Sequence, residues 1–316
     1  MRVLVTGGAG FIGGNLVHTL LAAGHEPGII DDFSTGSIAN VHPAAWMRSL
    51  DITGPELGEA IAQFAPEAVV HLAAQVDVTA SVTDPDRDRL VNVEGSRAVA
   101  AAARDAGATR FVTASSAAVY GPDAPIPTPE DAVKAPSNPY GEHKLASEGA
   151  VAEAFGGDDR QFAVLRFSNV FGPRQSWRGE GGVVAIFAHR MLTGQTPVVY
   201  GDGAQTRDLI YVGDVCDAII LALTRVTPLA DRAGPDGPAY NISTGGRTTI
   251  EALAGMMAQM TGYEGSIDHA PARPADVPDS ALDPTKARGA FGFSAHTELA
   301  AGLAQTVRWF AHQLNA

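Results

Sequence analysis

The sequence predicts an α/β protein with a doubly wound parallel sheet in residues 1–170 and a smaller mixed lobe in residues 171–316. In the first part, short apolar runs alternate with helical patterns. These runs are apolar throughout, as strands buried on both faces require. After residue 170 the alternation breaks, and short strands and helices are separated by loops rich in Pro, Asp and Gly. The two lobes can interleave, because loops from both are expected to form the cleft.

The predicted elements follow one another along the chain. Each strand is a short apolar run, and each helix is a longer segment with apolar residues at helical spacing. Strands are expected at 2–6, 28–30, 47–50, 68–72, 110–115 and 162–167, and helices at 11–24, 55–65, 86–106 and 139–155. In the second lobe, strands are expected at 197–200, 208–212 and 239–243, and helices near 183–193, 213–225, 249–261 and 298–314.

Composition excludes several classes of partner. The 316 residues carry a net charge of −13, whereas nucleic acids and anionic membranes require a basic surface. The only cysteine, Cys216, cannot form an internal disulfide, which fits a reducing cytoplasmic location. Cys216 lies in an apolar helical pattern, so we expect it to be buried. No segment approaches the length of about 18 apolar residues that a membrane span needs.

A glycine-rich loop follows the first predicted strand. Gly7, Gly10 and Gly13 form the pattern GxxGxxG immediately before a predicted helix. Glycines there allow close approach to a pyrophosphate, and the helix N-terminus offers free N–H groups to the anion. The second strand ends at Asp31 and Asp32, where a carboxylate can accept both hydroxyls of an adenosine ribose and would repel a 2′-phosphate. The pattern therefore favours NAD over NADP.

Three polar residues indicate a site for oxidation and reduction. Tyr140 and Lys144 are one turn apart on a predicted helix, so they share one face. A phenol with a pKa of about 10 is a poor base, but the Lys144 ammonium and the positive nicotinamide both favour phenolate. Ser115 and Ser116 lie at the C-terminal end of a predicted strand, where α/β sheets bind ligands. A serine hydroxyl there can hydrogen-bond the substrate oxygen that Tyr140 deprotonates.

Several motifs then occur in a recognisable order: TGGAGFIG, HLAAQ, SSAAVYG, YGEHK, NVFGPRQ and GDGAQTRDLIYVGDV. Together they resemble the UDP-glucose 4-epimerase-like nucleotide-sugar enzymes of the extended short-chain dehydrogenase/reductase family, and the resemblance covers nearly the whole chain. It implies an NAD-binding Rossmann domain with a small C-terminal substrate lobe. It also implies tightly held NAD and a homodimer packed through the helices near 86–106 and 139–155.

The resemblance also implies the roles of individual residues, and it implies no metal site. It gives the catalytic set as Ser116, Tyr140 and Lys144. The residues expected to contact NAD are Gly7, Gly10, Phe11, Ile12, Gly13, Asp31, Asp32, Phe33, Ser34, Thr35, Gly36, Asp51, Ile52, Leu72, Ala73, Ala74, Gln75, Asn92, Tyr140, Lys144 and Ser168. Those expected to contact a UDP-sugar are Ser116, Tyr140, Asn169, Val183, Val198, Tyr200, Arg207 and Arg273. The two arginines also have a physical reason, because an acidic protein needs local guanidinium groups to hold a diphosphate.

The expected reaction is epimerisation at C4 through a transient 4-keto sugar. Related dehydratases and decarboxylases carry acidic residues where this chain has Ala117 and Ala118, and a methyl group cannot transfer a proton. UDP-glucose and UDP-galactose are the first expectation. Ser280 leaves room for an N-acetyl group, so UDP-GlcNAc and UDP-GalNAc are alternatives. A UDP-glucuronate 4-epimerase, another nucleotide-sugar dehydratase or reductase, and a non-catalytic NAD-sensing protein remain open. His143 is interpreted as a helix-face residue.

Overall fold

The centre of the protein is a seven-stranded parallel sheet with the order β11-β6-β5-β4-β1-β2-β3. The structure is a computed structural model that describes residues 1–156, 160–178, 182–225, 236–272 and 277–315. The predicted doubly wound parallel sheet is confirmed. Its strands are β1 (Arg2–Thr6), β2 (Glu26–Asp31), β3 (Trp46–Ser49), β4 (Ala68–His71), β5 (Arg110–Ser116), β6 (Gln161–Phe167) and β11 (Ala239–Ile242).

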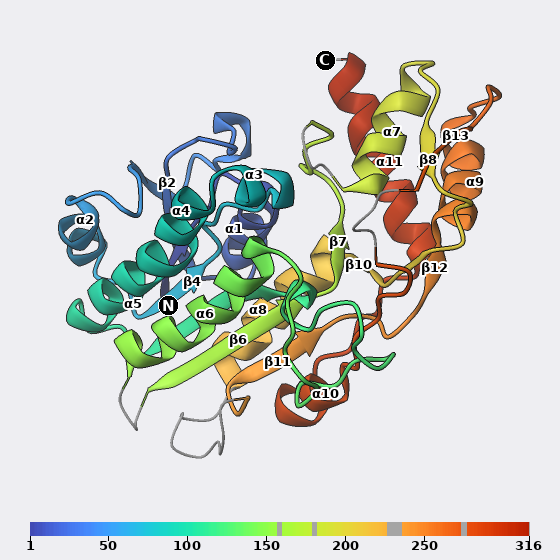
Figure 1. Ribbon diagram of the computed structural model, residues 1–316. Coiled ribbons are helices and arrows are strands. Elements are labelled where there is room, and N and C mark those ends of the chain that lie inside the picture. The colour runs from blue at the N-terminus through green and yellow to red at the C-terminus, as the bar shows by residue number, and fades with distance from the viewer. Residues whose placement is uncertain (157–159, 179–181, 226–235, 273–276, 316) are drawn as a thin grey trace.

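Helices cover both faces of this sheet (Figure 1). Side chains alternate between the faces of a strand, so Val3 and Val5 of β1 join one apolar cluster and Leu4 joins the other. This alternation explains why the strand sequences are apolar throughout. The first cluster includes residues of α1 (Phe11–Ala22) and α8 (Val212–Arg225), and the second includes residues of α2 (Leu57–Phe64), α5 (Ser96–Asp105) and α6 (Pro139–Phe155).

The helix predicted near 86–106 is divided into three pieces. Asp84 caps a short helix that begins at Pro85, and a π-helical segment follows it. Such segments are frequent at functional sites, and this one contains the buried Asn92. The structure also adds a short helix that the sequence analysis does not predict. These elements are α3 (Val78–Thr83), α4 (Pro85–Arg89), η2 (Leu90–Gly95) and then α5.

The second lobe forms around a third apolar cluster shared by α7, α9 and α11, at the upper right of Figure 1. Short strands in two-stranded sheets, separate from the large sheet, accompany these helices. Within the described part of the chain, no helix is both long and apolar enough to cross a membrane. The elements are β7 (Asn169–Phe171) paired with β10 (Leu209–Tyr211), β8 (Val198–Tyr200) with β13 (Asp268–Ala270), β9 (Thr206–Arg207) with β12 (Thr248–Thr249), and the helices α7 (Val183–Leu192), α9 (Ile250–Thr261), α10 (Thr285–Phe291) and α11 (Leu299–Asn315).

Two elements that follow residue 170 return to the first sheet. The strand β11 pairs with β6 at the sheet edge, and α8 packs against α1, β5 and β6. The sequence predicts both segments in the second lobe but leaves interleaving open. Pairing with β11 satisfies the backbone groups along one side of β6, which would otherwise be an exposed edge. The division of the chain at residue 170 stays a prediction.

A buried ion pair joins α6 to the sheet. The Arg166 side chain on β6 is 1% exposed, and its Nε and Nη2 atoms lie 3.0 and 2.7 Å from the two carboxylate oxygens of Glu148 on α6. The Ser115 hydroxyl on β5 donates to the same carboxylate at 2.5 Å. Buried charges are tolerated when they are paired and hydrogen-bonded, as these are. The arrangement therefore fixes α6 relative to two strands.

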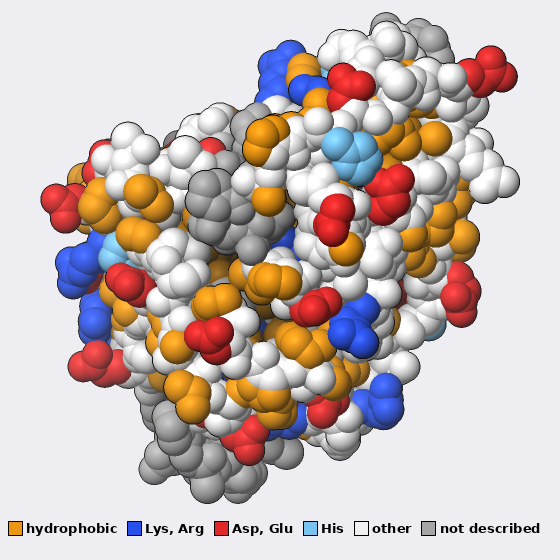
Figure 2. Space-filling model, turned by 45° about the vertical axis from the view of Figure 1, so that its right-hand side comes forward, with side chains coloured by type: hydrophobic (Ala, Val, Ile, Leu, Met, Phe, Trp, Pro, Cys, Tyr) orange, Lys and Arg blue, Asp and Glu red, His pale blue; other side chains and the backbone are white. Residues whose placement is uncertain are grey.

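Acidic side chains are dispersed over the visible surface. Figure 2 shows Asp and Glu side chains separated by apolar and basic ones on the face turned toward the viewer, without a continuous basic area among the described residues there. This distribution agrees with the net charge of −13.

Removing the charge of Glu148 is expected to destabilise the fold. In the Glu148→Gln variant the buried Arg166 guanidinium keeps the Asp236 carboxylate at 2.9 Å but loses its two hydrogen bonds to a charged Glu148, and we expect the free energy of unfolding to fall by about 2 kcal/mol. Urea denaturation followed by circular dichroism measures this change. Glu142→Gln, an exposed position on the same helix, is the control and should change stability by less than about 0.5 kcal/mol. Equal effects of the two substitutions would contradict the assigned role.

Candidate functional site

The glycine loop lies directly on the end of β4. Gly7 has φ +73°, and a Cβ there would lie 2.7 Å from the backbone nitrogen of Ala73. A Cβ on Gly13 would lie 2.1 Å from the carbonyl oxygen of Gly7. Both positions therefore require glycine for the loop to fold. Gly10 differs, because a Cβ there would approach only the Gly7 oxygen, at 3.2 Å, so its other side is open.

The first turn of α1 is suited to an anion. Gly10 is the N-cap, so no side chain caps the N–H groups at this end, and the first turn contains no acidic residue. Phe11 and Ile12 begin the helix and are half-buried. Uncapped N–H groups at the positive end of a helix dipole bind phosphate groups well. The open side of Gly10 and this helix end fit the pyrophosphate of a dinucleotide.

Asp31 links the glycine loop to the turn that follows β2. Its carboxylate accepts hydrogen bonds from the backbone nitrogens of Ala9, at 2.9 Å, and Phe33, at 2.8 Å. Burial raises the pKa of Asp31, and the two backbone hydrogen bonds oppose that rise. Phe33 has φ +59°, a strained value for a non-glycine residue. Asp32 is exposed and accepts from the backbone and hydroxyl groups of Ser34.

The other residues predicted around the adenosine have mixed environments. Thr35 is exposed, and a Cβ on Gly36 would lie 2.7 Å from an Asp31 carboxylate oxygen. Asp51 accepts from the backbone and hydroxyl of Thr53, both at 2.8 Å, as in a turn. Ile52 is 5% exposed and belongs to the core. These contacts do not test a role in adenine binding, which stays a prediction.

A clamp holds the segment after β4, where Leu72, Ala73, Ala74 and Gln75 are half-buried. The amide side chain of Asn92 accepts from the backbone nitrogen of Gln75 and donates to its carbonyl oxygen, both at 2.9 Å. Asn92 itself is 1% exposed. The predicted cofactor residue Asn92 therefore also orders the loop on which other predicted cofactor residues lie.

Ser116 and Tyr140 meet at the C-terminal end of β5. The Ser116 hydroxyl accepts from the backbone nitrogen of Ala118 at 3.2 Å and lies close enough to the Tyr140 phenol to lower its pKa. Tyr140 lies in the first turn of α6, which Asn138 caps. The Tyr140 backbone nitrogen, unused within the helix, donates to the buried Ser81 hydroxyl at 3.1 Å. The structure thus brings together two of the three predicted catalytic side chains.

Burial disfavours the charged form of both titratable groups on α6. Desolvation raises the pKa of Tyr140, the Ser116 hydroxyl lowers it, and the Asp88 charge raises it. Desolvation lowers the pKa of Lys144 to about 8. The Lys144 ammonium donates to the carbonyl oxygen of Ala114 at 2.6 Å. The sequence predicts that Lys144 lowers the pKa of Tyr140, but Lys144 is not among the groups that shift this pKa in the structure. Its ammonium is directed at the Ala114 carbonyl on β5 instead.

Ser168 has a buried hydroxyl oxygen without a hydrogen-bond partner in the described part of the chain. It directly follows β6, and its residue is 8% exposed. Native proteins rarely leave a buried hydroxyl unpaired, so this atom fits a position completed by a bound molecule. The position of Ser168 beside the cofactor stays a prediction.

The predicted sugar-nucleotide residues extend across the second lobe. Val183 begins α7, whose N-cap Gly182 provides no side-chain cap. Val198 and Tyr200 lie on β8, where Tyr200 is 37% exposed. Asn169 begins β7 with an exposed side chain. These residues belong to different short strands and helices, so no local sequence pattern could place them together.

Of the two arginines predicted to bind the diphosphate, Arg207 lies within the described residues. Arg207 on β9 is half-buried, and its Nη1 atom donates to the carbonyl oxygens of Thr206 and Val277, both at 2.7 Å. Arg273 lies outside the described residues. Arg207 is thus held beside the segment that leads away from Arg273 in the sequence. The roles of both residues stay predictions.

Asp88 and Ser81 are functional-site neighbours that the sequence does not predict. Asp88 lies in the run PDRDR, which has the pattern of a solvated helix, yet its side chain is fully buried beside His143. His143, predicted as a helix-face residue, contacts Asp88 at 2.7 Å. Ser81 is a buried residue in α3, a helix that was not predicted. No sequence signal marks either contact, because both depend on tertiary packing.

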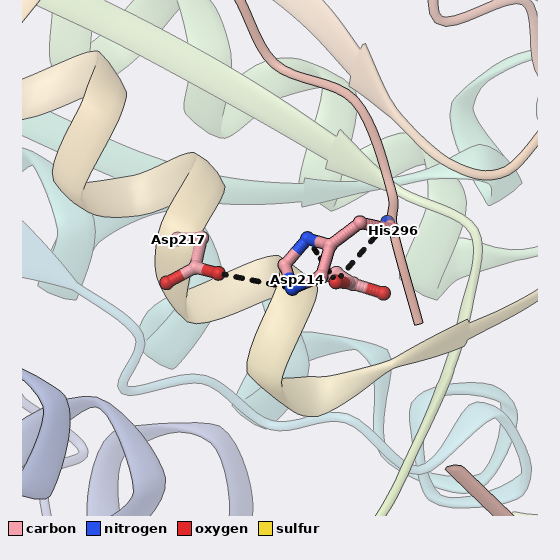
Figure 3. A group of neighbouring side chains, drawn as sticks. All are labelled: Asp214, Asp217 and His296. Carbon is pink, nitrogen blue, oxygen red and sulfur yellow. Dashed lines mark hydrogen bonds and ion pairs between the residues drawn. The ribbon is translucent and has the colours of Figure 1, made fainter. Parts of the chain in front are cut away.

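A separate group consists of Asp214, Asp217 and His296 (Figure 3). The Asp214 carboxylate lies 2.9 Å from His296 Nδ1 and accepts from the backbone nitrogens of His296 and Thr297 and from the Thr297 hydroxyl. Asp217 lies farther away, 3.9 Å from His296 Nε2. The oxygens of Asp214 are therefore engaged in fastening the segment before α11 to α8.

Comparison with known proteins gives one family throughout. The family model described as "NAD dependent epimerase/dehydratase family" matches residues 3–243. A UDP-glucose 4-epimerase from Mycolicibacterium smegmatis is 39% identical over 321 residues, covering 99% of each chain. Among solved structures, the UDP-glucose 4-epimerase of Thermotoga maritima with UDP-glucose gives a TM-score of 0.92 at 36% identity, covering 99% of this chain and 100% of that one.

The UDP-glucose 4-epimerase of Thermus thermophilus, solved with NAD, gives a TM-score of 0.87 at 36% identity over 98% of this chain and 99% of that one. Both the family match and the full-length relatives agree with the glycine loop, the acid after β2 and the parallel sheet described above. The chain therefore belongs to the NAD-dependent epimerase/dehydratase family.

Proposed function

We propose that this NAD-dependent 4-epimerase interconverts UDP-glucose and UDP-galactose. The observation that carries the proposal is that Ser116, at the end of β5, lies beside Tyr140 and is followed directly by Ala117 and Ala118. The pair can remove and return the proton of a sugar hydroxyl. The two alanines provide no acid or base that could eliminate water or drive decarboxylation. Reversal then remains as the exit for the oxidised sugar.

The loop and helix end at Gly10, the carboxylate of Asp31 and the open hydroxyl of Ser168 are the groups that would hold NAD. Bound NAD⁺ would supply a hydride acceptor that returns the same hydride, and a positive charge close to the phenol. Asp31 would accept the ribose hydroxyls at one end. Because Asp31 is already fixed by Ala9 and Phe33, its carboxylate is oriented before any ligand binds.

Tyr140 as phenolate takes the proton of the sugar 4-hydroxyl while C4 loses its hydride, which leaves a 4-keto sugar. The Ser116 hydroxyl stabilises the phenolate and positions the sugar oxygen. Rotation of the keto sugar about its diphosphate tether exposes the other face of C4. Tyr140 then returns the proton as the hydride is restored, so C4 is inverted without net oxidation. Lys144 would hold the nicotinamide ribose, and the positive charge that favours phenolate would come from bound NAD⁺.

The second lobe would hold the tether during this rotation. Arg207 is fixed by two backbone carbonyls and, with Arg273, would bind the diphosphate. Asn169 at the start of β7, Val183 at the start of α7, and Val198 with Tyr200 on β8 would receive the nucleotide end. Because the nucleotide and diphosphate do not react, they can be bound tightly while the sugar rotates.

The choice between sugars depends on the small residue Ser280. Its backbone carbonyl accepts from the Asp208 nitrogen at 2.9 Å, which fixes this position beside β9 and β10. A serine side chain leaves space for an N-acetyl group, so UDP-GlcNAc and UDP-GalNAc are the second candidate pair. UDP-glucose remains the first choice because full-length relatives are named for that activity.

The proposal includes a homodimer formed by η2, α5 and α6. In the described structure α5 and α6 pack against each other, and Leu90 of η2 is 42% exposed beside them. Ala146 and Gly149 lie on the exposed side of α6. Small side chains at these positions allow the helices of two subunits to approach closely.

Turnover and its dependence on Tyr140 test the proposed reaction. Purified protein, without added NAD, should convert UDP-glucose into UDP-galactose, as observed by NMR of the sugar anomeric protons. UDP-GlcNAc and UDP-glucuronate complete the panel. Tyr140→Phe should lower kcat by about 10² to 10⁴, because the base is lost while binding groups remain. Normal turnover by Tyr140→Phe, or a requirement for added NADH, would contradict the mechanism.

The two glycines should separate cofactor binding from folding. We expect Gly10→Ala to weaken NAD binding at least about tenfold, since the added methyl lies where the pyrophosphate would bind, and to lower the stability of the NAD-free protein by only about 1 kcal/mol, because alanine is a poorer N-cap than glycine and its Cβ lies 3.2 Å from the Gly7 oxygen. Gly13→Ala should instead lower the free energy of unfolding by about 2 kcal/mol or more, because its Cβ meets the Gly7 oxygen. Calorimetric NAD titration and urea denaturation measure the two effects. Unweakened NAD binding by Gly10→Ala argues against pyrophosphate binding there.

The dimer can be disrupted without disturbing the subunit fold. A Cβ at Gly149 meets nothing within 4 Å, so Gly149→Arg should fold normally yet sediment as a monomer in analytical ultracentrifugation. Gly255→Arg, an equally open and exposed helical position on α9, is the matched control and should remain dimeric. A dimer that survives Gly149→Arg would place the interface elsewhere.

A further inference from the structure

Asp88 joins three segments of the candidate site. Its side chain is fully buried, and its Oδ1 atom accepts from Gln75 Nε2 at 2.6 Å and from Asn92 Nδ2 at 3.2 Å. Its Oδ2 atom lies 2.7 Å from His143 Nδ1 on α6. One carboxylate thus contacts the loop after β4, the π-helical segment η2 and the helix that carries Tyr140.

His143 lies between the two candidate catalytic residues of α6. It is three residues after Tyr140, so both side chains lie on adjoining parts of the helix surface, and it directly precedes Lys144. The His143 side chain is 15% exposed, whereas that of Asp88 is 0% exposed. The negative charge of Asp88 acts on Tyr140 and Lys144, and it raises the pKa of both.

An uncompensated Asp88 carboxylate would work against catalysis. It would disfavour phenolate at Tyr140, the form that the proposed reaction needs. A protonated His143 in contact with Asp88 cancels this charge while keeping the carboxylate available to Gln75 and Asn92. The same carboxylate can then order the cofactor loop without opposing the base.

We propose that Asp88 and His143 form a carboxylate–imidazolium pair that positions the Gln75 loop against α6 and shields Tyr140 from the negative charge of Asp88. Both are positioning residues, since they act through Gln75, Asn92 and Tyr140. The inference rests on the proposed function in one respect, namely that Tyr140 acts as the base.

Few other charged groups lie near Asp88 and His143 on the side of the pair that faces the protein interior. The helix α3 contains no titratable residue, and α6 contributes Tyr140, Lys144 and the buried Glu148, whose carboxylate is held by Arg166. On η2, Glu94 is engaged by Arg89 at 2.9 Å. Asp77, before α3, caps that helix by accepting from the Ala80 nitrogen.

On α4 itself the remaining charges face outward. Asp84 caps the helix, Asp86 and Arg89 are exposed, and the exposed Arg87 lies 3.4 Å from Asp51. Glu142 of α6 is exposed as well. Among these groups, Asp88 and His143 are therefore the two whose charges can alter the electrostatic field at the Tyr140 phenol.

The test compares Asp88→Asn, His143→Gln and the double variant, with the exposed Asp86→Asn as the matched control. The pH dependence of kcat/KM is measured for each. His143→Gln uncovers the carboxylate, so the acid limb of its profile should move to higher pH by about half a unit or more. Asp88→Asn should not move it upward, and the double variant should return to the position of Asp88→Asn. Asp86→Asn should match the unmodified protein.

A second measurement does not depend on turnover. The phenolate absorbance of Tyr140, taken as the difference from the same variant carrying Tyr140→Phe, is titrated with pH in the NAD-loaded protein. The order of the midpoints should match the kinetic order. If this order is found in a protein without epimerase activity, the pairing stands and the proposed function fails.

Two results would overturn the inference. One is an acid limb and a phenolate titration in His143→Gln that match the unmodified protein. The other is a double variant that behaves like His143→Gln, because removal of the carboxylate would then have no effect. Should Asp88→Asn fail to fold, His143→Lys takes its place: it retains a positive charge and should not show the upward shift of His143→Gln.

Discussion

The buried carboxylate of Glu148 determines where the reactive part of α6 lies. It is held by Arg166 of β6 and by the hydroxyl of Ser115 on β5, so the helix cannot slide along the sheet without exposing a buried charge. Lys144 is one turn before Glu148, and Tyr140 is one turn before Lys144. The buried ion pair of Glu148 and Arg166 thereby sets the positions of Tyr140 and Lys144 relative to the C-terminal end of β5.

The same burial that positions these groups also favours their neutral forms. Desolvation raises the pKa of Tyr140 and lowers that of Lys144 to about 8, although Glu148 and Asp88 oppose the change at Lys144. Under the proposed function, the phenol becomes a useful base only when additional positive charge is present. The protein would then suppress proton removal in the absence of its cofactor, which limits unproductive reaction of a sugar bound alone.

The two lobes meet because the chain crosses between them more than once. The strand β11 and the helix α8 complete the sheet and one of its faces after the chain has already entered the second lobe. The strand β7 directly follows β6 and pairs with β10, so this pair continues from the C-terminal end of β6. Such an arrangement allows the first lobe to contact a dinucleotide and the second lobe to contact a separate substrate beside it. This agrees with membership of the family.

The sequence alone determined the features that depend on local chemistry: the parallel strands from uniformly apolar runs, the glycine loop, the acid after β2 and the spacing of Tyr140 and Lys144 on one helix face. Tertiary structure alone decided the features that depend on neighbours distant in the chain. Examples are the recruitment of β11 to the first sheet, the use of Ser81 by the Tyr140 backbone, and the burial of Asp88 against His143. Periodicity reports which face of an element is buried, whereas only packing decides what lies against it, so a buried aspartate in a charged run could not be distinguished from a solvated one.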